Sequence, residues 1–475
     1  MTIERNPHSS AAIDAQAQAT FPPGLAGDIA RFNFAHAPYP NATVAIAGAL
    51  ALMAALCGRF ANVSGTGLNI WIGIVGGTGI GKEAAQSGIA KLTGIASQQV
   101  PCINEFIGPS SWASPEAIHK RLAGTPCVLG FIGELGMKIK IWCSPKASLI
   151  FASLVAFMLD VYGKSGDGNV LQARENSNKD NGALAVQSPA LSLLGDTTPS
   201  ELYGALGERE IQNGFLPRWI LAFAGDQRGP ANKDRLLLPP EALLASIQNL
   251  AAAALAHQRP GTVTDVGLSP EAQAIDDEIE AFTSAQINNT HAEVTRQLWS
   301  RARLNVLKVA ALLAVGDWSD GSFTITGAHI TWARQFVFAG ILKVLAEFES
   351  GATGEMDGNQ SVQEKRLIEV IKLFVEKPWG DVRCYNVREE MHAKRVIPMH
   401  YITKRLQTTA AFKNDKLGAT TAIQRTIKLM LESDVLREMP TKQMLELFGS
   451  KPRAFVVSNP EVILGRSSDW LGKFY

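Results

Sequence analysis

The feature that most constrains this chain is a glycine-rich loop that follows an apolar segment. Residues 68–75 have the pattern of a short buried strand, and the run Gly76-Gly77-Thr78-Gly79-Ile80-Gly81-Lys82-Glu83 comes directly after it. The run matches GxxxxGK, in which glycines let backbone N–H groups surround phosphate oxygens while the lysine reaches the β and γ phosphates. The sequence therefore predicts a P-loop whose eight residues bind ATP; a plain glycine-rich turn is the alternative.

The segments around this loop alternate between strand and helix patterns. Further strands are expected at four places, with helices between them: Val100 to Phe106, Cys127 to Ile132, Ala190 to Leu194, and Trp219 to Phe223. Such alternation predicts a parallel sheet with helices on both faces. We expect an α/β P-loop NTPase core of the AAA+ or RecA-like kind over residues 67–228.

The residues expected to hold Mg²⁺ depart from the usual motor-ATPase pattern. The position after the lysine is Glu83 rather than Ser or Thr, and the apolar strand at residues 128–132 is followed by Gly133 and Glu134. Glu134 stands where motor ATPases keep the glutamate that orients the attacking water, whereas Gly133 replaces an aspartate. A carboxylate beside the phosphates costs roughly 4 kcal/mol at ~4 Å unless a cation lies between them. Our hypothesis is that Glu83 takes over the Mg²⁺ role; the alternative is a domain that binds nucleotide without hydrolysing it.

Two later segments supply candidates for sensing and transferring phosphate. Asp196 and Thr197 follow the strand at 190–194, at the sheet edge where open α/β folds bind ligands. Either side chain is a candidate γ-phosphate sensor, and Thr197 is our catalytic candidate; a helix cap at Thr198, with Pro199 first in the helix, is the other explanation for this polar run. Arg218 precedes the next strand and is a candidate to stabilise phosphate charge in a neighbouring subunit, with a surface salt bridge as its alternative.

A polar stretch of residues 163–186 is expected to form a hairpin inserted before the strand at 190–194. Lys164, Arg174 and Lys179 lie in it. In a ring-shaped motor these cations would follow the phosphates of single-stranded DNA without reading its sequence. An ordinary solvated loop explains the same composition.

The remaining segments divide the chain into further parts. We expect a flexible arm at 1–25, a helical segment at 26–66, a separate helical domain at 229–350, a linker at 351–361 and a winged-helix-like domain at 362–475. In the helical domain, helices are expected at 270–284, 294–315 and 329–349. In the last domain, helices are expected at 362–376, 386–394, 399–411 and 420–432, before two strands at 435–439 and 454–457 that flank a turn.

Composition excludes several classes of protein. The net charge is +1, so an interaction with DNA has to come from a local patch. Such a patch is available at Lys394, Arg395, Lys404, Arg405, Lys413, Lys416, Arg425 and Lys428, although interspersed carboxylates also fit a solvated face.

The apolar run at residues 44–57 is too short for a membrane span, so we expect a buried helix and no membrane partner. Five scattered cysteines fit a reducing compartment, which we expect to be the cytoplasm.

In this order, the motifs resemble P-loop ATPases of the primase-helicase type from phages, plasmids and integrated elements. The resemblance spans most of the chain and rests on Gly58-Arg59, Asn69, the P-loop, Gly108-Pro109-Ser110, Ser114-Pro115-Glu116, Glu134, Thr197-Thr198-Pro199, Gly214-Phe215-Leu216-Pro217-Arg218 and Leu298-Trp299-Ser300-Arg301-Ala302. It implies an ATPase of the additional-strand glutamate class, similar to ring-forming replicative helicases, with Arg218 as the arginine finger. It further implies a hexameric ring, ATP and Mg²⁺ at subunit interfaces, and a primase or primase-polymerase partner.

Three functions follow from these observations. The first is an ATP-dependent DNA helicase or translocase in the replication of a mobile element. The second is a catalytically weak P-loop protein that acts as a helicase loader, origin-binding factor or scaffold, suggested by Glu83 and Gly133. The third is a small-molecule kinase, against which the helical and winged-helix-like additions argue.

Overall fold

The computed structural model describes residues 21–110, 112, 114–143, 148–173, 184–205, 214–256, 263–290, 292–317, 323–350, 357–413, 418–432 and 435–458. The chain forms two compact units, residues 1–350 and 351–475. The predicted boundary at residue 351 coincides with the division between these units. Most of the expected arm, residues 1–20, lies outside the described residues, and helix α2 (Gly24–His36) already includes the last two positions of that arm.

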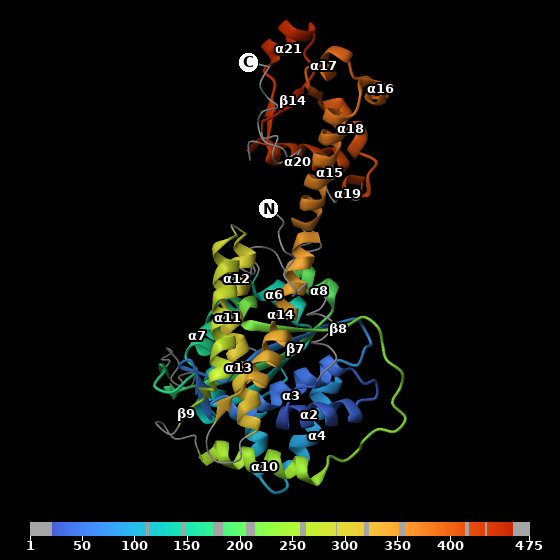
Figure 1. The fold of residues 1–475 in the computed structure, drawn as a ribbon. Coiled ribbons are helices and arrows are strands. Elements are labelled where there is room, and N and C mark those ends of the chain that lie inside the picture. Colours follow the sequence, from blue (N-terminus) through green and yellow to red (C-terminus); the bar gives the residue numbers. More distant parts are fainter. Residues whose placement is uncertain are drawn as a thin grey trace. The chain divides into compact units, whose positions relative to one another are not determined.

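The first unit is organised around a parallel sheet, as predicted, and this sheet has four strands rather than the five expected (Figure 1). Its strands are β3 (Trp71–Gly76), β4 (Cys127–Ile132), β7 (Ala190–Thr197) and β8 (Trp219–Gly225). They lie in the order β4-β7-β3-β8, and every neighbouring pair is parallel. β3 and β4 are buried along their whole length, which explains why their sequences are continuously apolar rather than alternating.

One face of the sheet packs against helices from both ends of the unit. α2, α3 (Ala42–Cys57), α4 (Ala84–Ala96), α10 (Glu241–Ala256) and α13 (Ala302–Gly316) share a hydrophobic core with Ile70, Ile72 and Ile74. α3 is buried on all sides, since 15 of its 16 residues are inaccessible, as its uninterrupted apolar sequence predicts. Among the described residues, no helix has both the length and the hydropathy needed to span a bilayer.

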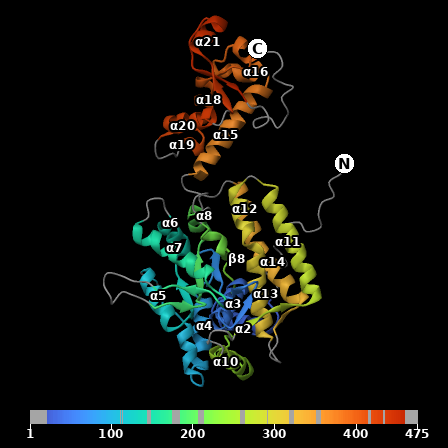
Figure 2. The ribbon, with the colours of Figure 1, turned by 90° about the vertical axis from the view of Figure 1, so that its left-hand side faces the viewer.

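The other face of the sheet packs against a second core. It is covered by α5 (Pro115–Gly124), α6 (Leu135–Trp142), α7 (Leu149–Gly163) and α8 (Pro199–Ala205). Figure 2 shows α5, α6 and α7 on one side of the unit, away from α11 (Pro270–Asn288) and α12 (Glu293–Ser300). The ring of Trp71 lies 5.0 Å from that of Tyr162 and 5.5 Å from that of Trp219, so strands and α7 are joined by aromatic contacts.

The prediction of a strand at residues 100–106 is wrong. The segment forms a 3-10 helix, η1 (Pro101–Phe106), and only Ile107 makes an isolated parallel bridge, to Leu129. Pro101 explains the difference, because proline has no N–H for a strand ladder and its fixed φ suits the first turn of a helix.

The prediction of a separate helical domain at residues 229–350 is also wrong. α13 packs into the same core as β3, and α14 (Gly327–Ser350) contacts β8. Short strands extend the connection. β1 (Ala61–Val63) pairs with β2 (Thr66–Gly67) and β9 (Thr264–Asp265), and β10 (Gly267–Leu268) pairs with β11 (Thr324–Ile325). Buried on nearly every side, α13 cannot be stable apart from the sheet, which the local sequence does not reveal. The helix expected at 294–315 is interrupted at Arg301, between α12 and α13.

The second unit combines helices with a small antiparallel sheet. Its elements are α15 (Asp357–Glu376), α16 (Trp379–Val382), η4 (Arg383–Tyr385), α17 (Glu389–Ala393), β12 (Ile397–Pro398), α18 (Met399–Leu406), α19 (Ala410–Lys413), α20 (Ala419–Glu432), β13 (Leu436–Glu438), α21 (Thr441–Phe448) and β14 (Ala454–Val457). The strand order is β12-β14-β13. Both predicted strands are present, but α21 stands where a turn was expected. α15 begins inside the expected linker, whose residues 351–356 lie outside the described part.

Candidate functional site

The glycine loop lies at the carboxyl end of β3 and leads into α4. Gly79 and Gly81 have φ angles of +79° and +93°, which glycine adopts without the steric cost of a Cβ atom. The Gly77 N–H donates to the carbonyl oxygen of Gly225 at 3.0 Å, fixing the start of the loop to the end of β8. Ile80 is buried beneath the loop, so it anchors the loop rather than facing a ligand. The loop therefore has the strand-to-helix setting that the motif requires.

The Lys82 ammonium group folds over the start of its own loop. Nζ donates to the carbonyl oxygens of Gly76, at 2.7 Å, and Gly77, at 3.2 Å. Thr78 and Gly79 at the tip of the loop are exposed. A half-buried ammonium beside the N-terminus of α4 favours an anion at this position. These residues fit the phosphates of a nucleoside triphosphate.

A cavity of about 200 Å³ lies beside Lys82 at the carboxyl edge of β3, β4 and β7. Lys82, Glu83, Ser110, Gly133 and Asp196 are among the residues that line it. The structure thus brings together the lysine and both positions where the sequence departs from the usual metal pattern. Ligands of open α/β folds bind at this edge of the sheet.

Asp196, rather than Thr197, faces this cavity. Burial raises the pKa of the Asp196 carboxyl, Lys82 opposes the rise, and the carboxylates of Glu134 and Glu83 add to it. Thr197 is 1% exposed, and its Oγ1 accepts a hydrogen bond from the Gly136 N–H at 3.2 Å. The Thr197 hydroxyl is therefore used to hold helices together, and Asp196 is the polar side chain of this strand end that a ligand can reach.

Two carboxylates on one cavity are the arrangement that suits a hard cation. Glu83 and Asp196 both line the space beside Lys82. Carboxylate oxygens are the protein ligands that Mg²⁺ accepts, together with waters and phosphate oxygens. The described residues contain no cluster of three or more His, Cys, Asp or Glu side chains arranged for a metal ion. A cation here would therefore need oxygen ligands from a nucleotide as well.

Glu134 is held by a second carboxyl group. It follows β4 with a left-handed φ of +53° and forms the N-cap position of α6. Its carboxyl lies within hydrogen-bonding reach of the Glu201 carboxyl on α8. Burial and this contact with Glu134 raise the pKa of Glu201. In this arrangement Glu134 is not among the residues that line the cavity.

Glu201 was not identified from the sequence as a site residue. It lies in Thr198-Pro199-Ser200-Glu201, the pattern of a helix start, and the Glu201 N–H donates to Thr198 Oγ1 at 3.3 Å. The predicted helix cap at Thr198, with Pro199 first in the helix, is thus confirmed. Nothing in that local pattern indicates that the same glutamate reaches Glu134.

Arg218 lies at the opposite edge of the sheet from the glycine loop. It ends the 3-10 helix η3 (Leu216–Arg218) and directly precedes β8, which runs parallel to β3. Its Nη1 donates to the carbonyl oxygen of Gly214 at 2.7 Å, and its guanidinium lies 5.5 Å from the centroid of the Tyr162 ring. Arg218 therefore cannot contact a ligand held at the glycine loop of its own chain.

The expected hairpin before β7 is present at its base. β5 (Val170–Leu171) pairs with β6 (Val186–Gln187) in antiparallel fashion. Lys164 is half-buried and lines an open cavity of about 480 Å³ with His119, Phe157 and Gln172. Arg174 and Lys179, the other predicted DNA contacts, lie outside the described residues.

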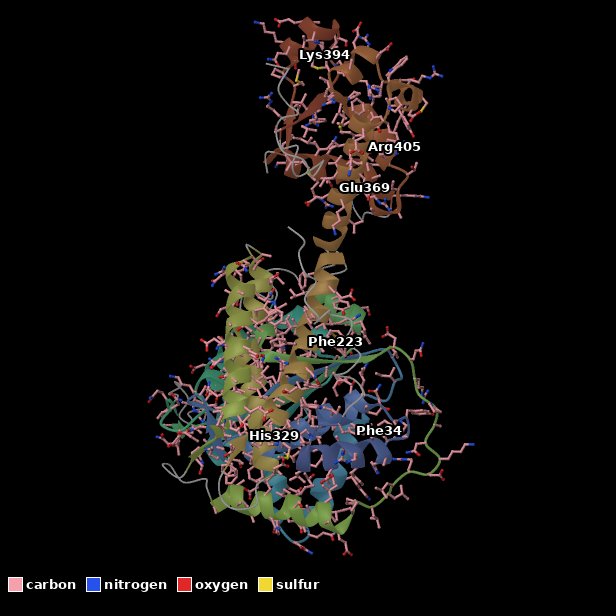
Figure 3. All side chains as sticks on the ribbon, viewed as in Figure 1. Phe34, Phe223, His329, Glu369, Lys394 and Arg405 are labelled. Carbon is pink, nitrogen blue, oxygen red and sulfur yellow. The ribbon has the colours of Figure 1, made fainter. Side chains whose placement is uncertain are left out.

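Part of the basic cluster in the second unit is used for internal contacts. Arg405 Nη1 donates to the hydroxyl of Tyr385 at 2.8 Å, and Arg425 Nη2 donates to Gln363 Oε1 at 3.1 Å. Lys394 and Lys404 are exposed, and Figure 3 shows Lys394 and Arg405 on this unit. The available charge is therefore smaller than the count of basic residues suggests.

No protein-family model matches the chain, and no curated protein matches it.

Proposed function

We propose that this chain is an ATP-dependent DNA helicase or translocase that acts in replicating a phage, plasmid or other mobile element. The observation that carries the proposal is the glycine loop between β3 and α4, with Lys82 over the carbonyl oxygens of Gly76 and Gly77 beside a polar cavity. A parallel sheet with this loop at its carboxyl edge suits a nucleotide whose phosphates meet the loop N–H groups.

Each residue of the site then has a role. Lys82 and the loop N–H groups bind the phosphates, and Glu83 with Asp196 would hold Mg²⁺ against them. ATP, when bound, supplies the phosphoryl group whose transfer to water drives movement. Glu134 orients that water after the Glu134 side chain turns away from Glu201.

The proposal includes assembly of several copies. Since Arg218 lies at the sheet edge opposite the loop, its action on phosphate needs a second copy, which favours a ring, expected to be a hexamer. Lys164, at the base of the β5–β6 hairpin, and the exposed lysines of the second unit, whose helices and small sheet suit a winged-helix module, are the proposed DNA contacts. A separate primase or primase-polymerase is the expected partner, in the cytoplasm of a bacterial host.

Steady-state ATP hydrolysis tests the proposal. The assay is run with and without single-stranded DNA at several Mg²⁺ concentrations, on the wild type, Lys82→Ala and Glu134→Gln. We expect DNA-stimulated, Mg²⁺-dependent turnover that both substitutions abolish. Turnover that survives Lys82→Ala would place the chemistry elsewhere, and nucleotide binding without turnover would favour the second candidate below.

The second candidate is a nucleotide-binding loader, origin-binding factor or scaffold with weak catalysis. It is favoured by Gly133 and Glu83 in place of the usual metal-binding residues and by the engagement of Glu134 with Glu201.

The double substitution Gly133→Asp with Glu83→Ser separates the two candidates. A Cβ atom at Gly133 meets nothing within 4 Å, so the aspartate fits without displacing neighbours. If the natural site is weak because it lacks this carboxylate, the variant gains at least tenfold in Mg²⁺-dependent turnover. If Glu83 already serves the metal, the variant gains nothing. Glu83→Ala alone then lowers both turnover and metal affinity, and an Ala variant that matches the wild type would end the Glu83 hypothesis.

A further inference from the structure

Two connections that are far apart in the sequence meet beside the glycine loop. One joins α2 to α3, and the other leads from β8 to α10, in green in Figure 1. The Asn232 N–H donates to the carbonyl oxygen of Pro38 at 2.8 Å, and Asn41 Nδ2 donates to that of Ala224, near the end of β8, at 2.9 Å. These hydrogen bonds hold the two connections against each other.

At this meeting point the Arg228 guanidinium lies over the ring of Tyr39. Its central carbon is 3.3 Å from the ring centroid, a close cation–π contact. Tyr39 is half-buried, and Pro38 and Pro40 on either side limit its backbone freedom. Arg228 remains exposed although the ring covers one side of its guanidinium. The pair therefore offers a flat, charged surface with an aromatic ring behind it.

This surface borders the glycine loop. A Cβ atom on Gly81 would lie 3.0 Å from the Tyr39 carbonyl oxygen and 3.4 Å from the Tyr39 Cβ. A Cβ atom on Gly77 would lie 3.0 Å from the Cα atom of Asp226, two residues before Arg228. Among the described residues that line the cavity beside Lys82, neither Tyr39 nor Arg228 appears. The loop thus has a polar cavity for phosphate and metal in one place and a stacked cation and ring in another.

We propose that Tyr39 and Arg228 form a platform on which the base of the bound nucleotide stacks, and that this platform makes the site prefer purines. The inference rests on the proposed function, because it places the base of a nucleotide whose phosphates meet the glycine loop. Aromatic rings and guanidinium planes are the side-chain surfaces on which bases stack.

Stacking also determines which bases the platform selects. The two fused rings of a purine cover more of the guanidinium and ring than the single ring of a pyrimidine does, so they make more dispersion contacts. Stacking does not read the hydrogen-bonding edge of a base. The platform therefore separates purine from pyrimidine nucleotides but does not separate adenine from guanine.

Two other uses of Arg228 give different results. A cation that binds the phosphates adds to the affinity for inorganic triphosphate, which has no base. A cation that only joins the two connections affects folding rather than the choice of base, and the hydrogen bonds of Asn232 and Asn41 already join them.

Calorimetric titration of the full chain with ATP and with inorganic triphosphate separates the base from the phosphates. We expect Arg228→Ala and Tyr39→Leu to weaken ATP binding about tenfold and to change triphosphate binding by less than about twofold. Tyr39→Phe keeps the ring and should match the wild type. Lys233→Ala is the matched control, because Lys233 is an exposed cation on the same connection. An equal loss for both ligands, or no loss for ATP, overturns the platform.

Thermal melts check that each variant is folded. If Tyr39→Leu fails to fold, Arg228→Ala decides the question, since it changes an exposed side chain.

Titration with GTP and CTP measures the preference for purines. In the wild type, ATP and GTP should bind with affinities within about threefold of each other, and CTP should bind at least about fivefold more weakly. Arg228→Ala should bring the ratio of ATP to CTP affinity close to one. Equal affinities for ATP and CTP in the wild type, or a ratio that Arg228→Ala leaves unchanged, refute the preference.

Photolabelling with 8-azido-ATP locates the base directly. We expect mass spectrometry of the digested chain to find the label on Tyr39 or on residues 226–229. A label found only elsewhere in the chain contradicts the platform.

The outcomes separate this inference from the proposed function. Base-dependent binding without DNA-stimulated hydrolysis supports the platform and refutes the helicase. DNA-stimulated hydrolysis, with ATP binding that Arg228→Ala leaves unchanged, supports the helicase and refutes the platform. A chain that binds neither ATP nor triphosphate refutes both.

Discussion

Glu134 has a backbone conformation that a glutamate rarely adopts. A left-handed φ costs a non-glycine residue of order 1 kcal/mol or more, and such residues persist where the surrounding structure holds them. Here the neighbouring contacts do so: α6 begins immediately afterwards, and the side chain is hydrogen-bonded to Glu201. The sequence identified the position of the candidate base, but its conformation depends on a helix that comes much later in the chain.

We expect Glu201→Gln to move the acid limb of the pH–rate profile to lower pH. Burial and the shared hydrogen bond with Glu134 raise the pKa of Glu201, and Lys82 works in the opposite direction. Glu201 therefore keeps its proton at a higher pH than an exposed glutamate does. Glutamine can still donate a hydrogen bond to Glu134 but holds no titratable proton.

The pH dependence of kcat/KM measures this shift. Glu241→Gln is the control, because Glu241 is likewise a first-turn glutamate but is exposed on α10. An acid limb that stays where it is in the wild type would mean that the pair does not control Glu134.

Lys308 makes the stability of the first unit depend on pH. Burial, Arg301 and Arg218 lower its pKa to about 7, whereas the group titrates near its ordinary value, 10.5, in the unfolded chain. Between these values the unfolded chain binds the proton and the folded chain does not, so this group makes stability rise with pH, by up to about 1.4 kcal/mol per unit. Below pH 7 the Lys308 amine is protonated in both states, so the full cost of burying the charged ammonium lowers the stability of the folded chain. Above pH 10.5 the amine is neutral in both states, and this cost vanishes.

Lys308→Met removes this contribution. We expect the melting temperature of the variant, relative to that of the wild type, to be highest near pH 7. This relative melting temperature should fall as pH rises to 10. A difference that is constant across this range would show that Lys308 keeps an ordinary pKa in the folded chain.

At the scale of elements, the site depends on the close packing of α6 against α8. Gly136 on α6 permits this contact: a Cβ atom there would lie 2.7 Å from both the Glu201 carbonyl carbon and Thr197 Oγ1. These short helices carry Glu134 and Glu201, so their spacing sets the distance between the two carboxyls.

We expect Gly136→Ala to destabilise the first unit by about 1–3 kcal/mol, because the methyl group forces the helices apart. It should also lower turnover, since Glu134 and Thr197 shift together. Gly94→Ala on α4 is the matched control: a Cβ there meets nothing within 4 Å, and the change should stabilise the helix by about 0.5–1 kcal/mol. Chemical denaturation measures both effects, and equal stabilities of the two variants would contradict the packing argument.

At the scale of the whole molecule, the two units have separate hydrophobic cores. The first contains the sheet and its covering helices, and the second is built around Phe374, Tyr401, Phe412 and Phe455. Each core is large enough to support an independent domain.

We expect a fragment of residues 1–350 to fold and to bind an ATP analogue as tightly as the full chain. Calorimetry of the full chain should show two unfolding transitions, one of which matches that of the isolated fragment 1–350. A single transition, together with a fragment that fails to fold, would show that the units depend on each other.

The sequence by itself determined the features that depend on local chemistry. A P-loop has to follow a strand, glycines have to supply its conformation, and apolar runs such as β3 and α3 have to be buried, so the parallel core followed from the pattern of residues. The segment 100–106, where a strand was expected, forms a 3-10 helix for a reason that is also local: Pro101 has no N–H for a strand ladder.

Only the tertiary structure decided which distant side chains meet. It turned Thr197 inward and Asp196 toward the cavity, brought Glu134 to Glu201, and placed Arg218 and Lys308 beside the ring of Tyr162. It also merged the helices after residue 229 into the first unit. These outcomes depend on how whole elements pack against the sheet, and hydrophobic burial that drives such packing has no direction that a local pattern can specify.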